Sequence, residues 1–438
     1  MRNIVKQYTG RLDGHLRELL FGASIAFFLK ISAAGLSFGL NVVLARTLGA
    51  KSSGAFFLVY TIIIIISSIG RIGMENALVR FIASNISANN PKKVLGVYRK
   101  AILYSLFTAT ILSVILYFLA PVISQVVFSK PELTRPLMIM AFAIVPLSLL
   151  TLHSNALQGM KKIASSISVL SIFVPFFTCL SAIIFVPRYG LDAVTMGYVL
   201  SAAITLIIGW VFWQRAIKPF KTYNAEFESK ELLHSSMPLF TIVIMNLIIT
   251  WSPMLFLGVW ESSENIGIYS AASRTSMLTS FVLVAVNSIA APKFASLYQK
   301  KDMKTLSTVA INSTKIMVLF ASPVLLTFIL IPEFILSLFG EQFVQGATVL
   351  RILAFGQFIN VSTGSVGYLL LMSGHERLMR NNLFFSSMLG IALNILLIPR
   401  YGIIGGAVAS AIILSTQNLI AMGIVWKKLG FRTIPWFR

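Results

Sequence analysis

Long apolar segments follow one another along the whole chain and are separated by short polar or Gly- and Pro-containing breaks. A transmembrane helix needs about 20 mainly apolar residues, and breaks of this kind mark the loops between such helices. The segments are too long for the strands of a membrane barrel, and they lack the alternation of apolar and polar positions that those strands show. The pattern therefore predicts an all-α, polytopic membrane protein with twelve transmembrane helices, at residues 20–45, 54–79, 101–128, 136–158, 165–187, 190–213, 234–258, 266–290, 308–331, 346–372, 382–398 and 402–426.

The composition agrees with this fold class and excludes most others. Hydrophobic residues make up 57% of the 438 positions and charged residues only 11%, against about 25% charged residues in soluble domains. A cytosolic enzyme, a secreted disulfide scaffold and a disordered chain are therefore excluded. Cys179 is the single cysteine and the four histidines are scattered, so the sequence predicts no intrachain disulfide, no metal site and no cofactor.

The basic residues set the predicted orientation. The formal net charge of +22 would suggest a nucleic-acid partner in a soluble protein, but in membrane proteins Lys and Arg gather in the cytoplasmic loops. When the N-terminus is placed inside, 25 of the 36 Lys and Arg residues fall in inside segments and 6 fall in outside loops. We therefore predict that both ends of the chain are cytoplasmic and that nucleic acid is not a partner.

The chain divides into two halves at its longest polar stretch. Residues 214–233 carry charges of both signs and separate the first six predicted helices from the last six. We therefore predict an N-terminal six-helix lobe at 1–213, which includes a short basic N-terminal segment. A cytoplasmic linker at 214–233 follows it, and then a C-terminal six-helix lobe at 234–438.

The two halves also share sequence landmarks. The motif Pro-Arg-Tyr-Gly begins the last predicted helix of each half, at 187–190 and at 399–402, an offset of 212 residues. Gly54 and Gly267, each followed two positions later by an aromatic residue, lie 213 residues apart. Because each half holds an even number of helices, both halves start on the same side of the membrane. This arrangement is typical of a parallel repeat, with the substrate site between the two lobes.

Five cations lie inside the predicted transmembrane helices, where a charged side chain costs roughly 2.5–3.5 kcal/mol on insertion scales. Glu75 is the one clearly intramembrane acid. A net positive interior favours an anionic substrate, and phosphate groups are natural partners of Lys and Arg. We therefore predict Glu75 as a candidate for ion coupling, and as substrate-binding residues Lys30, Arg71, Arg274, Lys315 and Arg351.

Each of these residues also has a structural interpretation. Arg71 lies one turn before Glu75, so that the two form a local ion pair in this alternative. Arg351 lies near the outer end of its helix, where a basic residue anchors the helix at the interface. Long side chains also extend along a helix toward water, which is the structural alternative for Lys30, Arg274 and Lys315.

Motifs of enzymes are missing from the sequence. Residues 45–52 resemble a phosphate-binding loop, but Ala45 and Ala50 stand where that loop requires glycine. No carboxylate pair and no Ser, His and Asp set lies on a loop large enough for an active site. His153, in the fourth predicted helix, is interpreted as a hydrogen-bonded packing residue. The sequence therefore predicts no catalytic residue, and its short outer loops argue against a membrane-embedded glycosyltransferase or ligase.

Several of these stretches carry a family resemblance. Residues 41–49, Gly54 with Phe56, and residues 73–83 resemble the opening of the polysaccharide-unit (Wzx-like) flippases of the polysaccharide transporter family. These flippases share a superfamily with MATE exporters and lipid II flippases. The two Pro-Arg-Tyr-Gly helix starts are similar to helix starts of the same family. Arg71 departs from the family pattern, which often has an acidic residue at this place.

The resemblance implies two six-helix lobes that form a V-shaped central cavity and alternate between inside-facing and outside-facing states. It implies transport, without covalent chemistry, of an undecaprenyl-pyrophosphate-linked oligosaccharide across the bacterial inner (plasma) membrane for O-antigen, capsule or exopolysaccharide synthesis. The implied partners are this anionic lipid-linked oligosaccharide, the lipid bilayer and the polysaccharide polymerase machinery. The alternative is a MATE-like, ion-coupled antiporter of organic cations, which needs a buried carboxylate; only Glu75 qualifies.

Overall fold

The computed structural model describes residues 14–220 and 222–434, and within them the chain is helical and contains no strand. The basic N-terminal segment, residues 1–13, lies outside the described residues. The α-helices of the first half are α2 (Gly14–Gly70), α3 (Met74–Ser87), α4 (Pro91–Val122), α5 (Thr134–Ala141), α6 (Ile144–Gly159), α7 (Ile163–Ile167) and α8 (Phe173–Ala216). Those of the second half are α9 (Ser229–Trp260), α10 (Ser263–Ser276), α11 (Phe281–Gln299), α12 (Met303–Leu330), α13 (Pro332–Ser337), α14 (Ala347–Ser362), α15 (Val366–Met372) and α16 (Glu376–Leu429).

Seven of the described helical segments are long and apolar enough to cross a membrane, or eight if the bent pair Pro131–Ala141 and Ile144–Gly159 is one span. Three long helices contain a glycine with non-helical backbone angles, namely Gly49 in α2, Gly190 in α8 and Gly402 in α16. A straight helix with the 54 residues of α16 would be about 80 Å long, far beyond the roughly 30 Å of a membrane core. The predicted all-α polytopic membrane protein is confirmed. Division of three of these eight spans at their glycines gives eleven segments, close to the twelve predicted.

The repeated Pro-Arg-Tyr-Gly motif adopts one backbone conformation in both halves. Gly190 has φ 56° and ψ −135°, and Gly402 has φ 56° and ψ −134°. Side chains disfavour a positive φ, whereas glycine adopts it readily. Glycine at the end of each motif therefore lets the chain reverse direction between two helices without a longer loop. At this point the sequence repeat is also a repeat of structure.

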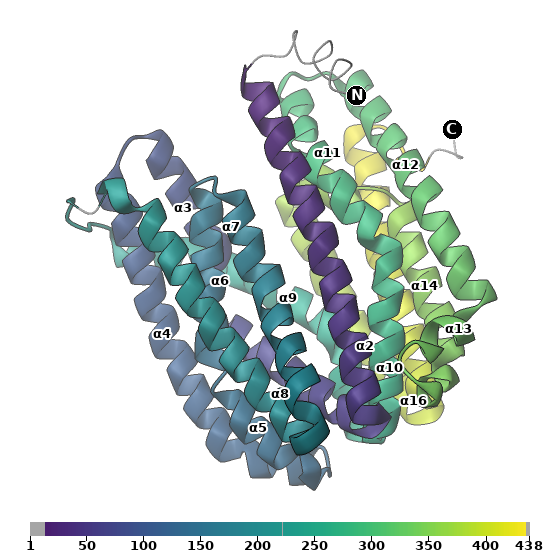
Figure 1. Ribbon diagram of the computed structural model, residues 1–438. Coiled ribbons are helices and arrows are strands. Elements are labelled where there is room, and N and C mark those ends of the chain that lie inside the picture. The colour runs from purple at the N-terminus through teal and green to yellow at the C-terminus, as the bar shows by residue number, and fades with distance from the viewer. Residues whose placement is uncertain (1–13, 221, 435–438) are drawn as a thin grey trace, which may run out of the picture.

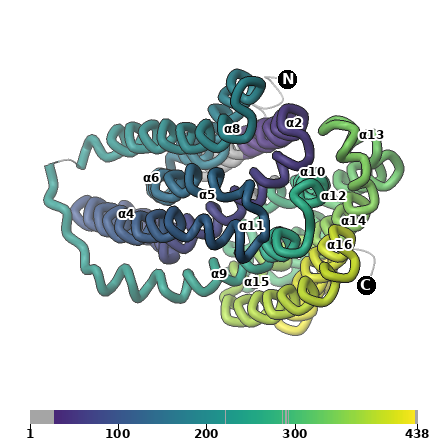
Figure 2. The backbone as a smooth tube through the Cα atoms, turned by 90° about the horizontal axis from the view of Figure 1, so that it is seen from below, coloured from purple at the N-terminus to yellow at the C-terminus, as the bar shows by residue number. Residues whose placement is uncertain are grey.

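The two halves form a V (Figure 1). They spread apart at the end where α2 begins and α16 ends, which we call the terminal face, and they meet at the opposite end, the joined face. Figure 2 shows the molecule from the joined face, with α2 and α10 side by side near the centre, and these two helices pack against each other. The part of α2 before Gly49 also contacts α11 of the second half.

The distribution of buried side chains explains the V shape. Toward the joined face one continuous hydrophobic core contains residues of both halves, such as Leu44 and Phe57 of α2 with Ile268 of α10. Toward the terminal face there are two separate cores: one around Trp213, which is built mainly from the first half but includes Leu232 of α9, and one around Phe294 of the second half. The joined face therefore holds the one core that both halves share extensively, while nearer the terminal face α9 packs against the break between α2 and α3, where a Cβ atom on Gly73 would lie 2.6 Å from the amide nitrogen of Phe240.

Candidate functional site

A cavity of about 530 Å³ lies between α2, α3, α6, the π turn η3 (Ser168–Ile172), α8 and α10. Its lining mixes hydroxyl and amide groups, two tyrosines, two arginines and one glutamate. Of the 20 lining residues, 19 belong to the first half of the chain, and Arg274 is the single one from the second half. The residues are Ser37, Leu40, Asn41, Tyr60, Ile64, Ser67, Ser68, Arg71, Glu75, Asn76, Leu147, Leu150, Thr151, Asn155, Leu170, Ser171, Val174, Pro175, Tyr198 and Arg274.

Arg71 lies in the break between α2 and α3 and is held by two side chains. Its Nε donates to Oε2 of Glu75 at 2.9 Å, and its Nη2 donates to Oγ of Ser68 at 2.8 Å. Arg71 is buried, with 8% of its surface exposed. Glu75 lies in the first turn of α3, where the helix dipole also favours a negative charge. Arg71 and Glu75 therefore form the local ion pair, and the part of the cavity around them carries no net charge.

Arg274 of α10 reaches across to the first half of the chain. The central carbon of its guanidinium lies 4.4 Å from the ring centre of Phe57 and 5.1 Å from that of Tyr60. Cations are attracted to the faces of aromatic rings at such distances. No carboxylate in the described part of the chain forms an ion pair with Arg274. Arg274 therefore contributes an uncompensated positive charge to the cavity.

The two arginines lie at different depths. Arg71 follows Phe57 by fourteen residues and Tyr60 by eleven along α2, which corresponds to about 16–21 Å along a helix axis. Arg274, which contacts both aromatic rings, is therefore nearer the joined face, and Arg71 is nearer the open terminal face. A single phosphate group does not touch both side chains in this state. The cavity therefore has a charged end near the joined face and a neutral end near the terminal face.

The other three predicted cations do not line this cavity. Lys30 is half-buried and lies on the helix face of Ser37 and Asn41, about 10–17 Å closer to the terminal face. Lys315 of α12 is exposed. Arg351 donates to Oε1 of Glu333 at 3.0 Å in a pair with both side chains well exposed. The structure thus brings two of the five predicted cations, with Glu75, to one cavity.

Sequence reasoning missed several polar lining residues. Thr151 and Asn155 lie one helical turn apart on α6 and face the cavity, as does Asn76 at the start of α3. The spacing of four between Thr151 and Asn155 was the available signal. Asn76 gave no periodic signal, because it lies in the first turn after the α2 break.

His153, between these two α6 residues, points into the lobe instead. It is 3% exposed, its Nδ1 lies 2.6 Å from the carbonyl oxygen of Leu149, and its Nε2 lies 3.0 Å from the hydroxyl of Tyr98. A carbonyl oxygen only accepts, so we assign the proton to Nδ1, and the hydroxyl of Tyr98 then donates to Nε2. The interpretation of His153 as a packing residue is confirmed.

At the joined face, hydrogen bonds cross between the halves. Lys130 is 8% exposed, and its Nζ donates to the carbonyl oxygen of Gly258 at 2.6 Å. Removal of the amine from water lowers the pKa of Lys130 below its usual value, although the nearby Glu132 and Glu261 act in the opposite direction. Further bonds across the two halves join Arg46 to Leu338, Ala50 to Gln342, and Ser263 to Glu132.

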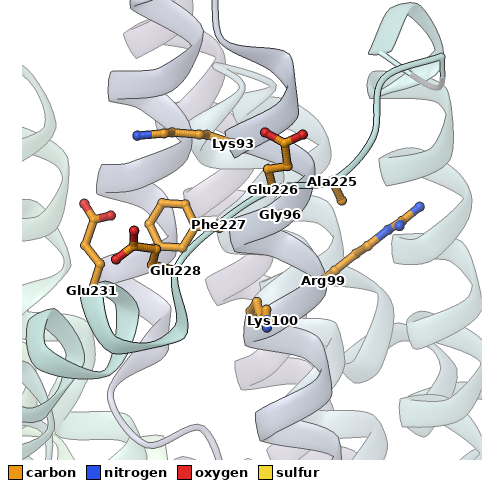
Figure 3. A pocket seen from close by; sticks show the side chains of 9 residues that line it. All are labelled: Lys93, Gly96, Arg99, Lys100, Ala225, Glu226, Phe227, Glu228 and Glu231. Atoms are coloured by element: carbon orange, nitrogen blue, oxygen red, sulfur yellow. The ribbon is translucent and has the colours of Figure 1, made fainter.

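A second pocket, of about 560 Å³, lies at the terminal face where the linker between the halves packs on α4. Its charged residues are Lys93, Arg99, Lys100, Glu226, Glu228 and Glu231. Figure 3 shows that Lys93 and Arg99 point in opposite directions, so the basic groups do not converge on one ligand. The amide of Glu226 donates to the carbonyl oxygen of Lys92 at 3.1 Å, which fixes the linker to the first half.

Comparisons with known proteins agree with this geometry. A family model described as "Polysaccharide biosynthesis protein" matches residues 19–298, and a model described as MatE matches residues 235–396. The probable low-salt glycan biosynthesis flippase Agl15 of Haloferax volcanii is 24% identical over 405 residues, which cover 90% of this chain and 80% of that protein.

Two solved structures show the same fold. The lipid II flippase MurJ in an inward closed conformation superposes with a TM-score of 0.75 at 16% identity, covering 93% of this chain and 87% of that chain. An inward-facing multidrug resistance MATE transporter of the MOP superfamily superposes with a TM-score of 0.72 at 14% identity, covering 92% and 98%. With a family model that spans more than half of its length, this multi-span membrane protein belongs to the polysaccharide biosynthesis protein family.

Proposed function

We propose that this protein is a flippase that moves an anionic, lipid-linked oligosaccharide across the cytoplasmic membrane by alternating access, without covalent chemistry. The observation that carries the proposal is the unpaired positive charge of Arg274 at the joined-face end of a polar cavity. Among the described lining residues the only acid is Glu75, and its carboxylate already forms an ion pair with Arg71. Such a site attracts a phosphate group and repels a cation.

The same observation argues against the second candidate, an antiporter of organic cations. A cation needs a carboxylate that is available to it, and Glu75 makes an ion pair with Arg71 at 2.9 Å. Coupling of transport to an ion through Glu75 remains part of the proposal, because separation of this pair would release the carboxylate.

The terminal face is proposed to be cytoplasmic, on the basis of the 25 to 6 distribution of basic residues. The described structure is then open toward the cytoplasm and closed at the outer side. We propose the lobes at 1–213 and 234–438, joined by the linker at 214–233, as the units that move. Reporter fusions at Lys92 and Lys301 should be cytoplasmic and fusions at Lys51 and Glu261 external. An external reporter at Lys301 would contradict this orientation.

An undecaprenyl-pyrophosphate carrier in a bacterial inner membrane is the proposed setting, with surface polysaccharide synthesis and its polymerase downstream. Agl15, a relative whose name includes "flippase", comes from an archaeon. The cytoplasmic membrane is common to both settings, and the nature of the polyprenyl carrier is open to direct test.

The test is transport in vesicles that contain the purified protein and a pyrophosphate-linked oligosaccharide. A glycosidase added outside measures how much substrate has reached the outer leaflet. Wild-type protein should move the substrate, Arg274→Ala should move little, and the control Arg351→Ala should resemble wild type. Export of an organic cation by wild-type vesicles that leave the lipid-linked sugar in place would establish the antiporter instead.

A further inference from the structure

The end of the cavity near the terminal face is polar but carries no net charge. On α6, Oγ of Ser148 donates to the carbonyl oxygen of Ser67 at 3.0 Å, which aligns α6 with α2. One turn closer to the terminal face, Thr151 lies at the level of Arg71, and a further turn brings Asn155 to the level of Glu75 and Asn76. Since Arg71 and Glu75 neutralise each other, the groups that face the cavity here are neutral. We call Asn76, Thr151 and Asn155 the polar collar.

The two amides of the polar collar have hydrogen-bonding capacity to spare. Within the described part of the chain, no hydrogen bond engages the side chain of Asn76 or Asn155, although both line the cavity. Asn85, on the same helix as Asn76, instead donates to the carbonyl oxygen of Phe81 at 2.8 Å. A side-chain amide offers two N–H donors and a carbonyl acceptor. This combination matches hydroxyl and acetamido groups, which both donate and accept, better than it matches a phosphate, which only accepts.

From this placement we infer that the polar collar is a subsite for an uncharged sugar ring of the substrate, separate from the phosphate site at Arg274. The inference rests on the proposed function. The levels of Arg71 and of the aromatic rings under Arg274 differ by about 16–21 Å along α2. A phosphate bound at Arg274 therefore leaves the polar collar to another part of the same molecule.

The polar collar then determines specificity. Each hydrogen bond between a side-chain amide of the polar collar and a hydroxyl or acetamido group strengthens binding roughly two- to tenfold, or about 0.5–1.5 kcal/mol, beyond the bond to water that it replaces, so a ligand with such a group binds better than one that lacks it. A carrier lipid without its sugar would satisfy Arg274 and leave the exposed Asn76 and the half-buried Asn155 with water alone as a partner. The protein would thereby select loaded carriers over empty ones.

The test measures binding of two probes to the full-length protein in lipid nanodiscs: undecaprenyl pyrophosphate, and the same lipid carrying one N-acetylglucosamine. Wild type should prefer the sugar-bearing lipid. The double variant Asn76→Ala with Asn155→Ala should bind that lipid about tenfold more weakly and bind the sugar-free lipid unchanged. Asn85→Ala is the matched control and should alter neither affinity. A second pair, Asn76→Ser with Asn155→Ser, keeps some hydrogen bonding and should give an intermediate loss at an unchanged melting temperature.

Arg274→Ala separates the inference from the proposed function. It should weaken both probes equally if the phosphate binds there. Equal loss of both probes in the asparagine variants, or no preference of wild type for the sugar-bearing lipid, would overturn the subsite while leaving phosphate recognition intact. If wild type binds neither probe, the proposed function fails and the subsite fails with it.

Discussion

Gly54 of the first half and Gly267 of the second, which the sequence repeat places in equivalent positions, meet backbone to backbone where α2 crosses α10. A Cβ atom on Gly54 would lie 2.6 Å from the amide nitrogen of Gly267 and would overlap the carbonyl oxygen of Ser263. A Cβ atom on Gly267 would overlap the carbonyl oxygen of Ala50. Only glycine permits so close an approach, so closure of the joined face depends on the missing side chains of these two residues.

Gly54→Ala should therefore prevent closure of the joined face. The added methyl group meets backbone atoms, which cannot move aside as a flexible side chain would. Transport should fall at least tenfold while the amount of protein in the membrane stays near normal. Labelling of a cysteine at the buried position Ser53, in a Cys179→Ser background, should become faster.

Gly35→Ala and Gly39→Ala are controls on the same helix, because no atom lies within 4 Å of a Cβ added at either position. They should retain transport and keep slow labelling. If Gly54→Ala retains both as well, the close approach of α2 and α10 does not gate the joined face.

Exchange of the charges in the Arg71–Glu75 pair should restore much of the abundance and thermal stability that either single change removes. Removal of one partner of a buried pair leaves an uncompensated charge and costs about 3–5 kcal/mol, so Glu75→Gln and Arg71→Gln should each lower abundance or thermal stability. The double variant Arg71→Glu with Glu75→Arg should recover part of that loss, with a coupling of about 0.5–3 kcal/mol. Additive effects in the thermal unfolding of the four proteins would show that the pair contributes nothing.

Arg274 should tolerate lysine better than alanine. Each charge-assisted hydrogen bond to a phosphate contributes about 1.5–3 kcal/mol, so Arg274→Ala should weaken binding of the lipid pyrophosphate roughly ten- to hundredfold. Arg274→Lys keeps the charge and loses the planar stacking on Phe57 and Tyr60, and should be intermediate. The measurement is binding to purified protein, and equal affinity of alanine and lysine variants would exclude a role for the charge.

Replacement of Lys30 should weaken equilibrium binding of the substrate less than it slows transport. It lies on the cavity-facing side of α2 but closer to the terminal face than the lining residues. Lys30→Ala should slow delivery of the substrate, and Lys30→Arg should restore part of the rate because the charge survives. A transport assay compared with equilibrium binding distinguishes these effects, and full transport by Lys30→Ala would remove Lys30 from the pathway.

A lower pH should favour opening of the joined face through Lys130. Burial lowers the pKa of this amine in the closed state. Exposure to water upon opening returns the pKa to its ordinary, higher value, so opening takes up a proton. The rate of labelling of the cysteine at position 53, corrected for the reactivity of the thiol in unfolded protein, should therefore decrease as the pH rises from the lowered pKa of Lys130 in the closed state toward its ordinary pKa. Lys130→Met should flatten this dependence; an unchanged slope in that variant would assign it to another group.

The sequence by itself determined the fold class, because an apolar segment of membrane length has only one stable conformation in lipid, the helix. It also determined the repeat: the Pro-Arg-Tyr-Gly motifs at 187–190 and 399–402 recur with the same backbone angles, since a positive φ selects glycine at both positions. The spacing of Arg71 and Glu75 was sufficient to propose their ion pair, because residues four apart on a helix are neighbours.

Only the tertiary structure decided which cations share a cavity. Lys30, Arg274 and Lys315 look alike in sequence, as single charges in apolar helices, yet Arg274 enters the cavity, Lys30 lies nearer the terminal face and Lys315 is exposed. The same holds for Asn155 and His153, two positions apart on α6, of which one faces the cavity and the other the hydroxyl of Tyr98. The reason is physical: helical periodicity gives the angle between side chains on one helix, but the packing of helices far apart in sequence decides which angle faces protein, lipid or water.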